Sequence, residues 1–311
     1  MSSLIREKLE FTSANGVNTI RGFILRKSEG PYKAVVQFAH GMTEHYERYE
    51  EIMTLLAENG YVAVIHDHLG HKHSVEDKAD LGYFAPKDGY KCVLSDMATI
   101  AGRMKKSFPQ LKLFLLGHSM GSFYTRVFAA KYPYLVDGVL LSGTSGPNPM
   151  IEPGLATISI MMKFKGERHR SKMVVKIMFG RYLDKIPNPK STRDWLSRDE
   201  AYVQKYRKDE YCSFIFTLSG YKDLITIIKI SNSEDCFKKT KKDIPYYMFS
   251  GDMDPVGDYG KGVREVYEAY KKVGVKDITL NLYEGGRHEM LNEINKTQVH
   301  ADILNWLETK I

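Results

Sequence analysis

The sequence has few of the features that mark secreted, disulfide-rich or membrane-spanning proteins. It holds three cysteines, Cys92, Cys212 and Cys236, and their spacing fits neither a zinc site nor a disulfide framework. No apolar run approaches the ~20 residues that a membrane-spanning helix requires. The first residues also lack the apolar segment typical of a secretory signal. These absences predict a cytoplasmic, reduced protein.

Compositional bias is absent as well. Glycine (25) and proline (11) are near their average frequencies, which excludes collagen-like and low-complexity chains. With 43% hydrophobic and 27% charged residues, the composition is that of a globular protein and excludes a disordered chain. A length of 311 residues allows two domains or one large α/β domain with an insertion.

The net charge of +7 is concentrated in one part of the chain. Residues 146–242 contain 20 Lys or Arg and 11 Asp or Glu, a balance of +9, so the remainder carries −2. No arginine-rich tail and no basic motif interleaved with aromatic residues accompanies this charge. We therefore predict no nucleic-acid partner.

Apolar runs of strand length alternate with helical patterns. Several runs are almost continuously apolar, which is typical of strands buried on both faces of a parallel sheet. The alternation predicts an α/β fold, a doubly wound and mostly parallel sheet with helices on both faces. The predicted strands are 5–11, 19–25, 34–39, 61–66, 111–116, 138–142, 246–250 and 278–283, and the helices between them are 49–58, 93–108, 122–131, 263–272 and 297–307.

The alternation breaks after Ser142. Residues 143–149 read as a loop, and the chain then reads mainly helical until a strand pattern resumes at Ile244. The sequence therefore predicts a core formed by residues 1–145 and 243–311, with residues 146–242 inserted as a helical cap. The helical patterns of the cap include 155–164, 172–179 and 214–230.

A glycine-flanked serine directly follows the fifth predicted strand, in the sequence Gly117-His118-Ser119-Met120-Gly121. A serine on a sharp strand-to-helix turn is held in sparsely populated backbone angles, at a cost of about 1–3 kcal/mol. The flanking glycines let strand and helix approach without Cβ clashes. The helix N-terminus directs free N–H groups at a developing oxyanion. In this context the pattern predicts that Ser119 is a nucleophile.

A nucleophilic serine needs a base, and the base needs an acid that orients it. Where this motif occurs, the chain order is serine, acid, histidine. His288 follows the eighth predicted strand and is our predicted base, while Asp252 and Asp254 follow the seventh. We favour Asp254 as the acid because Pro255 fixes the backbone after it, whereas Asp252 is suited to bind turn amides. Asp258 is a more distant alternative.

The oxyanion hole requires two backbone N–H groups. One belongs to the residue after the nucleophile, here Met120, and the other comes from the loop after the third strand. That loop reads His40-Gly41-Met42-Thr43-Glu44-His45. Gly41 permits the bend, so the N–H of Met42 is the second predicted donor.

Together these motifs resemble the monoacylglycerol lipase and lysophospholipase branch of the α/β-hydrolases, the serine aminopeptidase S33-like group. The resemblance covers nearly the whole chain. It implies an eight-stranded sheet, a helical cap over the serine, no cofactor, and hydrolysis of single-chain acyl esters. It further implies that Glu44 and Arg48 lie near a polar head group. The motifs are His40-Gly41-x-x-Glu44-His45-x-x-Arg48-Tyr49, Asp67-His68-x-Gly70-His71-x-x-Ser74, Gly117-x-Ser119-x-Gly121, Gly251-x-x-Asp254 and His288.

A metal site is the competing interpretation of one histidine-rich stretch. His66, His68, His71 and His73 lie close together, and neutral imidazole is a common metal ligand. The spacing approaches a two-metal hydrolase signature, but Gly70 stands where that signature has an acid. We therefore predict a structural turn and no metal.

The cap offers apolar surface for an acyl chain. Met161 and Met162 are flexible apolar residues suited to a pocket that accepts chains of varied shape, and we predict that they contact substrate. Basic residues surround them, namely Lys163, Lys165, Arg168, Arg170 and Lys172. The stretch suggests peripheral contact with lipid interfaces. The alternative is a helix packed on its own domain with solvated lysines.

The sequence thus predicts a serine hydrolase that cleaves carboxylic esters of single-chain lipids, monoacylglycerols or lysophospholipids, through an acyl-enzyme intermediate. A peptidase or an acyltransferase on the same fold stays an alternative. A pocket lined with carboxylates would favour an aminopeptidase, whereas this cap is net basic. A non-catalytic binding module is a third alternative, against which the complete set of serine, acid and histidine argues.

Overall fold

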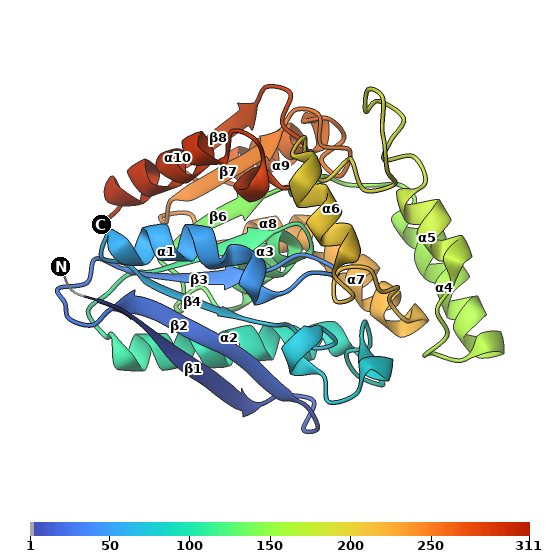
Figure 1. Ribbon diagram of the computed structural model, residues 1–311, viewed down its shortest axis with the longest axis horizontal. Helices are drawn as coiled ribbons and strands as arrows, with labels where there is room; N and C mark the ends of the chain where they lie inside the picture. The colour runs from blue at the N-terminus through green and yellow to red at the C-terminus, as the bar shows by residue number, and fades with distance from the viewer. Residues whose placement is uncertain (1–2) are drawn as a thin grey trace.

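All eight apolar runs form strands of one sheet in the computed structural model, which describes residues 3–311 (Figure 1). The order across the sheet is β1-β2-β4-β3-β5-β6-β7-β8. The strands are β1 (Leu4–Thr12), β2 (Thr19–Lys27), β3 (Val35–Ala39), β4 (Val62–His66), β5 (Leu113–His118), β6 (Gly138–Ser142), β7 (Tyr246–Gly251) and β8 (Ile278–Tyr283).

The sheet is antiparallel at one edge and parallel elsewhere. β1 pairs with β2 and β2 with β4 in antiparallel register, and the pairs from β4 through β3, β5, β6 and β7 to β8 are parallel. Every residue of β3, β4, β5, β6 and β7 is buried, because helices cover both faces of the central sheet. The predicted architecture, an eight-stranded and mostly parallel sheet with helices on both faces, is confirmed.

Two hydrophobic cores lie on opposite faces of the sheet. α1 (Glu50–Glu58) and α10 (Lys296–Glu308) pack on one face. α2 (Gly89–Ser107), α3 (Met120–Lys131) and α9 (Lys261–Lys272) pack on the other. The described short 3₁₀ helices are η1 (Tyr46–Tyr49), η2 (Lys72–Ser74), η3 (Lys78–Asp80) and η4 (Met290–Asn292).

The segment between β6 and β7 is helical and leaves the sheet at its carboxyl edge. Its helices are α4 (Ile151–Lys165), α5 (Lys172–Phe179), α6 (Glu200–Lys208), α7 (Leu218–Ser231) and α8 (Glu234–Lys239). α7 packs against α3 on one side and α4 on the other. Figure 1 shows α4 and α5, in yellow-green, furthest from the sheet. The pattern places the start of the third cap helix at residue 214, but α7 begins at Leu218 because the Thr217 side chain accepts the N–H of Gly220 and caps it.

None of the helices formed by residues 3–311 combines the length and the apolar composition needed to cross a membrane.

Candidate active site

Ser119 lies on the turn between β5 and α3. Its backbone has φ 51° and ψ −119°, a combination that L residues rarely adopt. The neighbouring glycines permit this geometry, since a Cβ on Gly121 would overlap the backbone of Ala39 and one on Gly117 would overlap that of Gly121. The chain therefore holds Ser119 in a strained turn at the start of α3, as the motif predicts.

His288 and Asp254 meet at the carboxyl ends of β7 and β8. The Nδ1 of His288 lies 2.9 Å from Oδ2 of Asp254, and both side chains are buried. The other carboxylate oxygen of Asp254 accepts the N–H of Val256 at 2.9 Å. Asp252 instead accepts the N–H of Gly285 at 2.7 Å. Of the candidate acids, Asp254 is thus the one that contacts the imidazole.

Opposing influences act on the pKa of His288. Complete burial favours the neutral ring and acts to lower the pKa. The Asp254 carboxylate favours the charged ring through its charge and its hydrogen bond, and Glu289 adds to this effect. The attraction prevails, so the pKa of His288 lies above its ordinary value of 6.5. Such a ring accepts a proton readily and is stabilised once it carries one.

The loop after β3 approaches Ser119 closely. Gly41 has little room for a side chain, because a Cβ there would overlap the Glu44 carboxylate and lie 3.2 Å from the Cβ of Ser119. Glu44 accepts the N–H of Gly41, and His71 Nε2 accepts the N–H of Thr43 at 3.3 Å. Thr43 has a positive φ of 52°. These contacts fix the segment on which Met42 lies, next to the serine.

A buried ion-pair cluster lies behind this loop. The Arg48 guanidinium is 3.3 Å from the Glu44 carboxylate and 2.6 Å from that of Glu289, and it also donates to the Tyr202 hydroxyl. Burial and the charge of Glu289 raise the pKa of Glu44 to about 7. For Glu289 burial acts in the same direction, but Arg48 outweighs it and holds the pKa below its usual value. Residues 40–45, which the sequence predicts to supply an oxyanion donor, are called the oxyanion loop below. The cluster joins this loop to the residue that follows His288.

These groups open onto a cavity of about 750 Å³ between the sheet and the helices inserted after β6. Ser119, His288, Met42, Met120 and Glu44 all line it. The remaining wall is mainly apolar and includes Phe123, Ile158, Val174, Met178, Phe214, Leu224, Ile225 and Ile228.

Three predicted substrate contacts lie elsewhere. Arg48 is buried beneath the cavity wall, where its donors bind carboxylates and a tyrosine. Met162 lines a separate, smaller hollow with Lys163 and Lys222. Met161 is half-buried against the apolar core next to it. The structure therefore brings Glu44 to the cavity, and places Ile158 of α4 there rather than the two methionines.

Comparisons with known proteins agree with this geometry. A family model described as serine aminopeptidase, S33, matches residues 30–295. The chain belongs to this family. The monoacylglycerol lipase of Mycolicibacterium smegmatis is 25% identical over 313 residues, which span 99% of both chains. The monoglyceride lipase of Rattus norvegicus is 25% identical over 290 residues, 92% of this chain and 86% of that protein.

A solved structure of a relative is also similar over its full length. The thermostable carboxyl esterase from Bacillus coagulans, solved in complex with glycerol, has a TM-score of 0.92 to this chain at 27% identity, with 99% of each chain covered. The comparisons confirm the S33-type α/β-hydrolase family predicted from the motifs.

The histidine-rich stretch of this S33 hydrolase is buried behind the oxyanion loop. His66 and His68 contact each other through ring nitrogens 3.1 Å apart. Burial lowers the pKa of His66 to about 3 and that of His71 to about 4, so both rings are neutral. Asp67 accepts the backbone N–H of His73 at 3.0 Å and faces its ring at 2.8 Å. These contacts favour a role in holding the turn.

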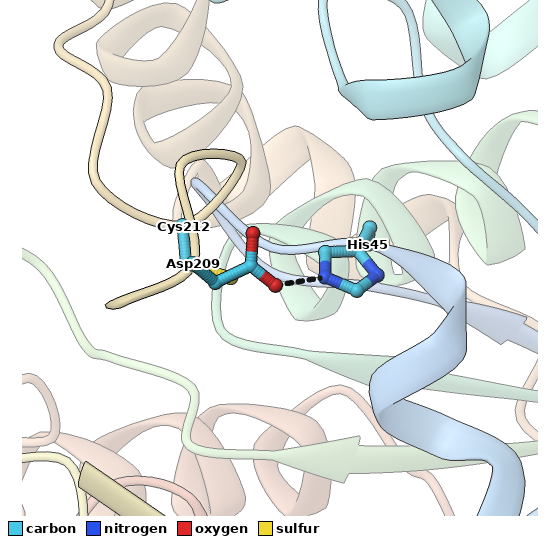
Figure 2. A group of neighbouring side chains, drawn as sticks. All are labelled: His45, Asp209 and Cys212. Carbon is cyan, nitrogen blue, oxygen red and sulfur yellow. Dashed lines mark hydrogen bonds and ion pairs between the residues drawn. The ribbon is translucent and has the colours of Figure 1, made fainter. Parts of the chain in front are cut away.

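Within residues 3–311, one group has the residue types and proximity of a metal site, His45, Asp209 and Cys212. Figure 2 shows the carboxylate of Asp209 facing the His45 ring, and the two atoms are 2.9 Å apart. Burial raises the pKa of Cys212 well above its usual range, which favours the neutral thiol. Arg48 lies 3.9 Å from that sulfur and opposes a cation. We interpret the group as a contact between the core and α6.

Sequence reasoning missed four residues of the S33 site. The Trp195 ring lies 5.1 Å from that of His288, and its carbonyl accepts the His288 N–H at 3.3 Å. Tyr206 bonds through its hydroxyl to Thr43. Arg193 and Glu289 line the cavity. The position of Glu289 directly after the base was a usable signal, whereas nothing in the cap sequence marks Arg193 or Tyr206.

Proposed function

We propose that this chain is a serine hydrolase that cleaves carboxylic esters of single-chain lipids. The observation that carries the proposal is that the strained Ser119 and the Asp254-bound His288 line the same largely apolar cavity. The lipase and esterase relatives support ester hydrolysis. The cytoplasmic location inferred from the sequence stays a prediction.

In the proposed mechanism Ser119 Oγ attacks the ester carbonyl while His288 takes the hydroxyl proton. Asp254 holds the ring and stabilises its charged form, which the raised pKa of His288 supports. The N–H groups of Met42 and Met120 bind the oxyanion, an interaction worth about 10²–10³ in rate for each donor. His288 then protonates the departing alcohol, and water activated by the same ring releases the fatty acid.

The two ends of the cavity suit the two ends of a single-chain lipid. Side chains of α3, α4, α5 and α7 form an apolar wall that fits an acyl chain. Thr43, Glu44, Arg193, Tyr206 and Glu289 form a polar end beside the oxyanion loop and His288. We therefore propose that the acyl chain lies toward the inserted helices and the alcohol toward the polar end.

The peptidase alternative is less well supported. An aminopeptidase needs a carboxylate free to bind the substrate ammonium group. Glu44 and Glu289 are the carboxylates nearest His288 in the cavity wall, and both are bound to Arg48. Neutral ester substrates need no such group, so the pairing of these two carboxylates favours esters at the end of the cavity next to His288.

We propose that residues 146–242 act as a cap and that its outer helices contact lipid interfaces. α4 and α5 expose large apolar side chains, with Phe164 84% and Ile177 64% accessible. Lysines accompany them on the same helices, Lys163, Lys165, Lys172 and Lys176. An exposed surface of mixed apolar and basic character is typical of peripheral lipid binding.

A panel of p-nitrophenyl esters of increasing acyl length, with 1-monoacylglycerols alongside, tests the proposed reaction. We expect kcat/KM to rise with acyl length until the acyl chain fills the apolar end of the cavity. Ser119→Ala should show no turnover. Turnover retained by Ser119→Ala, or cleavage of aminoacyl amides in preference to esters, would contradict the proposal.

A further inference from the structure

The charged side chains that line the cavity differ in whether they are already paired. Glu44 and Glu289 share Arg48 between them. Lys261 lies 3.9 Å from Asp258, and both are exposed. Arg193 is half-buried, and its guanidinium forms no hydrogen bond or ion pair with any residue in 3–311. The six charged lining residues are Glu44, Arg193, Asp258, Lys261, Glu265 and Glu289.

The nearest acid in the sequence cannot neutralise Arg193. The Asp194 carboxylate accepts the N–H of Lys190 at 2.6 Å and also binds the N–H and the hydroxyl of Ser191. The Arg193 guanidinium instead lies 5.9 Å from the ring centroid of Tyr206. A guanidinium removed from bulk water without an acceptor is costly. Such a group is expected where a ligand supplies the acceptor.

Arg193 lies at the alcohol end of the cavity. Its neighbour Tyr206 bonds to Thr43 of the oxyanion loop, 2.9 Å between the hydroxyl oxygens. Two residues further along the chain, the Trp195 ring contacts His288. Burial raises the pKa of both Tyr206 and Tyr221, and the positive charge of Arg193 opposes that rise in each. The guanidinium charge of Arg193 therefore extends over the part of the cavity between the oxyanion loop and α7.

We infer that Arg193 forms an anion subsite in the cavity that Ser119 lines, and that the preferred lipids are single-chain acylglycerols with a phosphate on the glycerol. The inference rests on the proposed ester hydrolysis and names its head group. A planar guanidinium binds phosphate oxygens in bidentate geometry, which neutral glycerol cannot match. Arg48 cannot take this role, because its donors are used by Glu44, Glu289 and Tyr202.

The reaction is an ordinary hydrolysis. The acyl–oxygen bond breaks, the hydroxyl of water joins the acyl carbon, and the proton goes to the alcohol oxygen of the departing glycerol phosphate. Arg193 touches only the phosphate, so its expected effect is on binding and on the choice between head groups.

The test compares kcat/KM for 1-oleoyl lysophosphatidate, 1-oleoylglycerol and 1-oleoyl lysophosphatidylcholine, each below its micelle concentration. We expect the wild-type chain to prefer lysophosphatidate. In Arg193→Gln the ratio of lysophosphatidate to oleoylglycerol should fall about 10- to 100-fold, the usual loss of a charged hydrogen-bond partner, mostly through KM. Arg193→Lys keeps the charge without the planar group and should give an intermediate ratio.

Arg181→Gln is the matched control, since this arginine belongs to the same inserted segment but its side chain is 92% exposed. Arg181→Gln should leave the ratio of kcat/KM for lysophosphatidate to that for oleoylglycerol unchanged. A wild-type preference for oleoylglycerol, or an unchanged ratio in a folded Arg193→Gln, overturns the anion subsite while ester hydrolysis stands. Failure of the wild-type chain to cleave any of the three lipids overturns the proposed function itself.

Discussion

In the proposed mechanism, the contact between Asp254 and His288 sets the pH range in which Ser119 can be activated. A general base works only in its neutral form. Because the pKa of His288 lies above 6.5, activity is expected to rise with pH through a value above 6.5 and to be lost on the acid side. The carboxylate therefore orients the ring and moves the acid limit of the reaction upward.

Replacing this carboxylate should change both rate and pH dependence. In Asp254→Asn we expect kcat to fall by about 10⁴-fold, because the ring loses its orienting partner. The acid limb of the kcat/KM profile should also move to lower pH, since burial still lowers the pKa of His288 and the opposing charge is gone. Stopped-time assays of p-nitrophenyl butyrate hydrolysis across the acid range measure both effects.

Asp252→Asn is the control, because Asp252 contacts the Gly285 N–H and not the ring. The kcat/KM profile of Asp252→Asn should have its acid limb at the same pH as that of the wild-type chain. An Asp254→Asn variant with an unshifted limb would show that another group sets the pKa of the base.

Motifs predicted the backbone geometry at single residues where that geometry is set locally. The glycines around Ser119, and Pro255 after Asp254, are readable in the sequence because they impose backbone geometry. The neighbours of Arg48 were not readable. Its partner Glu289 lies 241 residues away, and only the folded sheet brings the two together. The family resemblance implied that Arg48 lies near a head group, whereas in the structure Arg48 forms internal ion pairs with Glu44 and Glu289.

Helices and strands, too, were predictable only where their own sequence determines which side chains are buried. The strands were predictable because their side chains are buried on both faces and the runs are continuously apolar. The short, polar α6 (Glu200–Lys208) was not predicted, since it buries only Val203 and Tyr206. α4 is apolar around much of its surface, so its sequence does not reveal that Ile158 is its buried residue. The packing of α4 against α7 decides that orientation.

The outer surface of α4 and α5 should bind anionic lipid. Each large apolar side chain placed in the interface contributes about 1.5–3 kcal/mol, and each lysine about 1 kcal/mol near an anionic surface. We expect the chain to float with phosphatidylglycerol vesicles at low salt. A variant carrying Ile160→Ser, Phe164→Ser and Ile177→Ser loses three such contributions and should bind about 10³-fold more weakly or worse.

A variant with Val17→Ser, Tyr134→Ser and Ile294→Ser controls for loss of exposed apolar surface, because these residues are 80%, 91% and 62% accessible and lie outside the inserted segment. It should float like the wild-type chain. Equal flotation of all three chains, or none at low salt, would exclude a lipid-binding role for α4 and α5.

Across the whole molecule, buried histidines couple folding to pH. Burial lowers the pKa of seven histidines, His40, His45, His66, His68, His71, His118 and His300. Between these lowered values and 6.5 the unfolded chain binds more protons than the folded one, so stability rises with pH. Three carboxyls with raised pKa, Glu44, Asp96 and Asp223, act in the opposite direction. The histidines are more numerous and prevail.

The free energy of unfolding should therefore decrease as pH falls below about 6.5, the ordinary pKa of histidine. For each net proton that the chain takes up on unfolding, the free energy of unfolding falls by about 1.4 kcal/mol per pH unit of acidification. Urea unfolding followed by tryptophan fluorescence at neutral and mildly acidic pH measures the change. A midpoint that stays constant or rises on acidification would contradict the neutral, buried state of these rings.

The most direct test of the proposed hydrolase is labelling by a fluorophosphonate, which reacts only with a serine that a neighbouring base activates. We predict a single adduct, located by peptide mass spectrometry on Ser119, in the wild-type chain. Labelling should be absent in Ser119→Ala and strongly slowed in His288→Ala, with both variants folded. An adduct on another residue, or no adduct on a folded wild-type chain, would contradict the account.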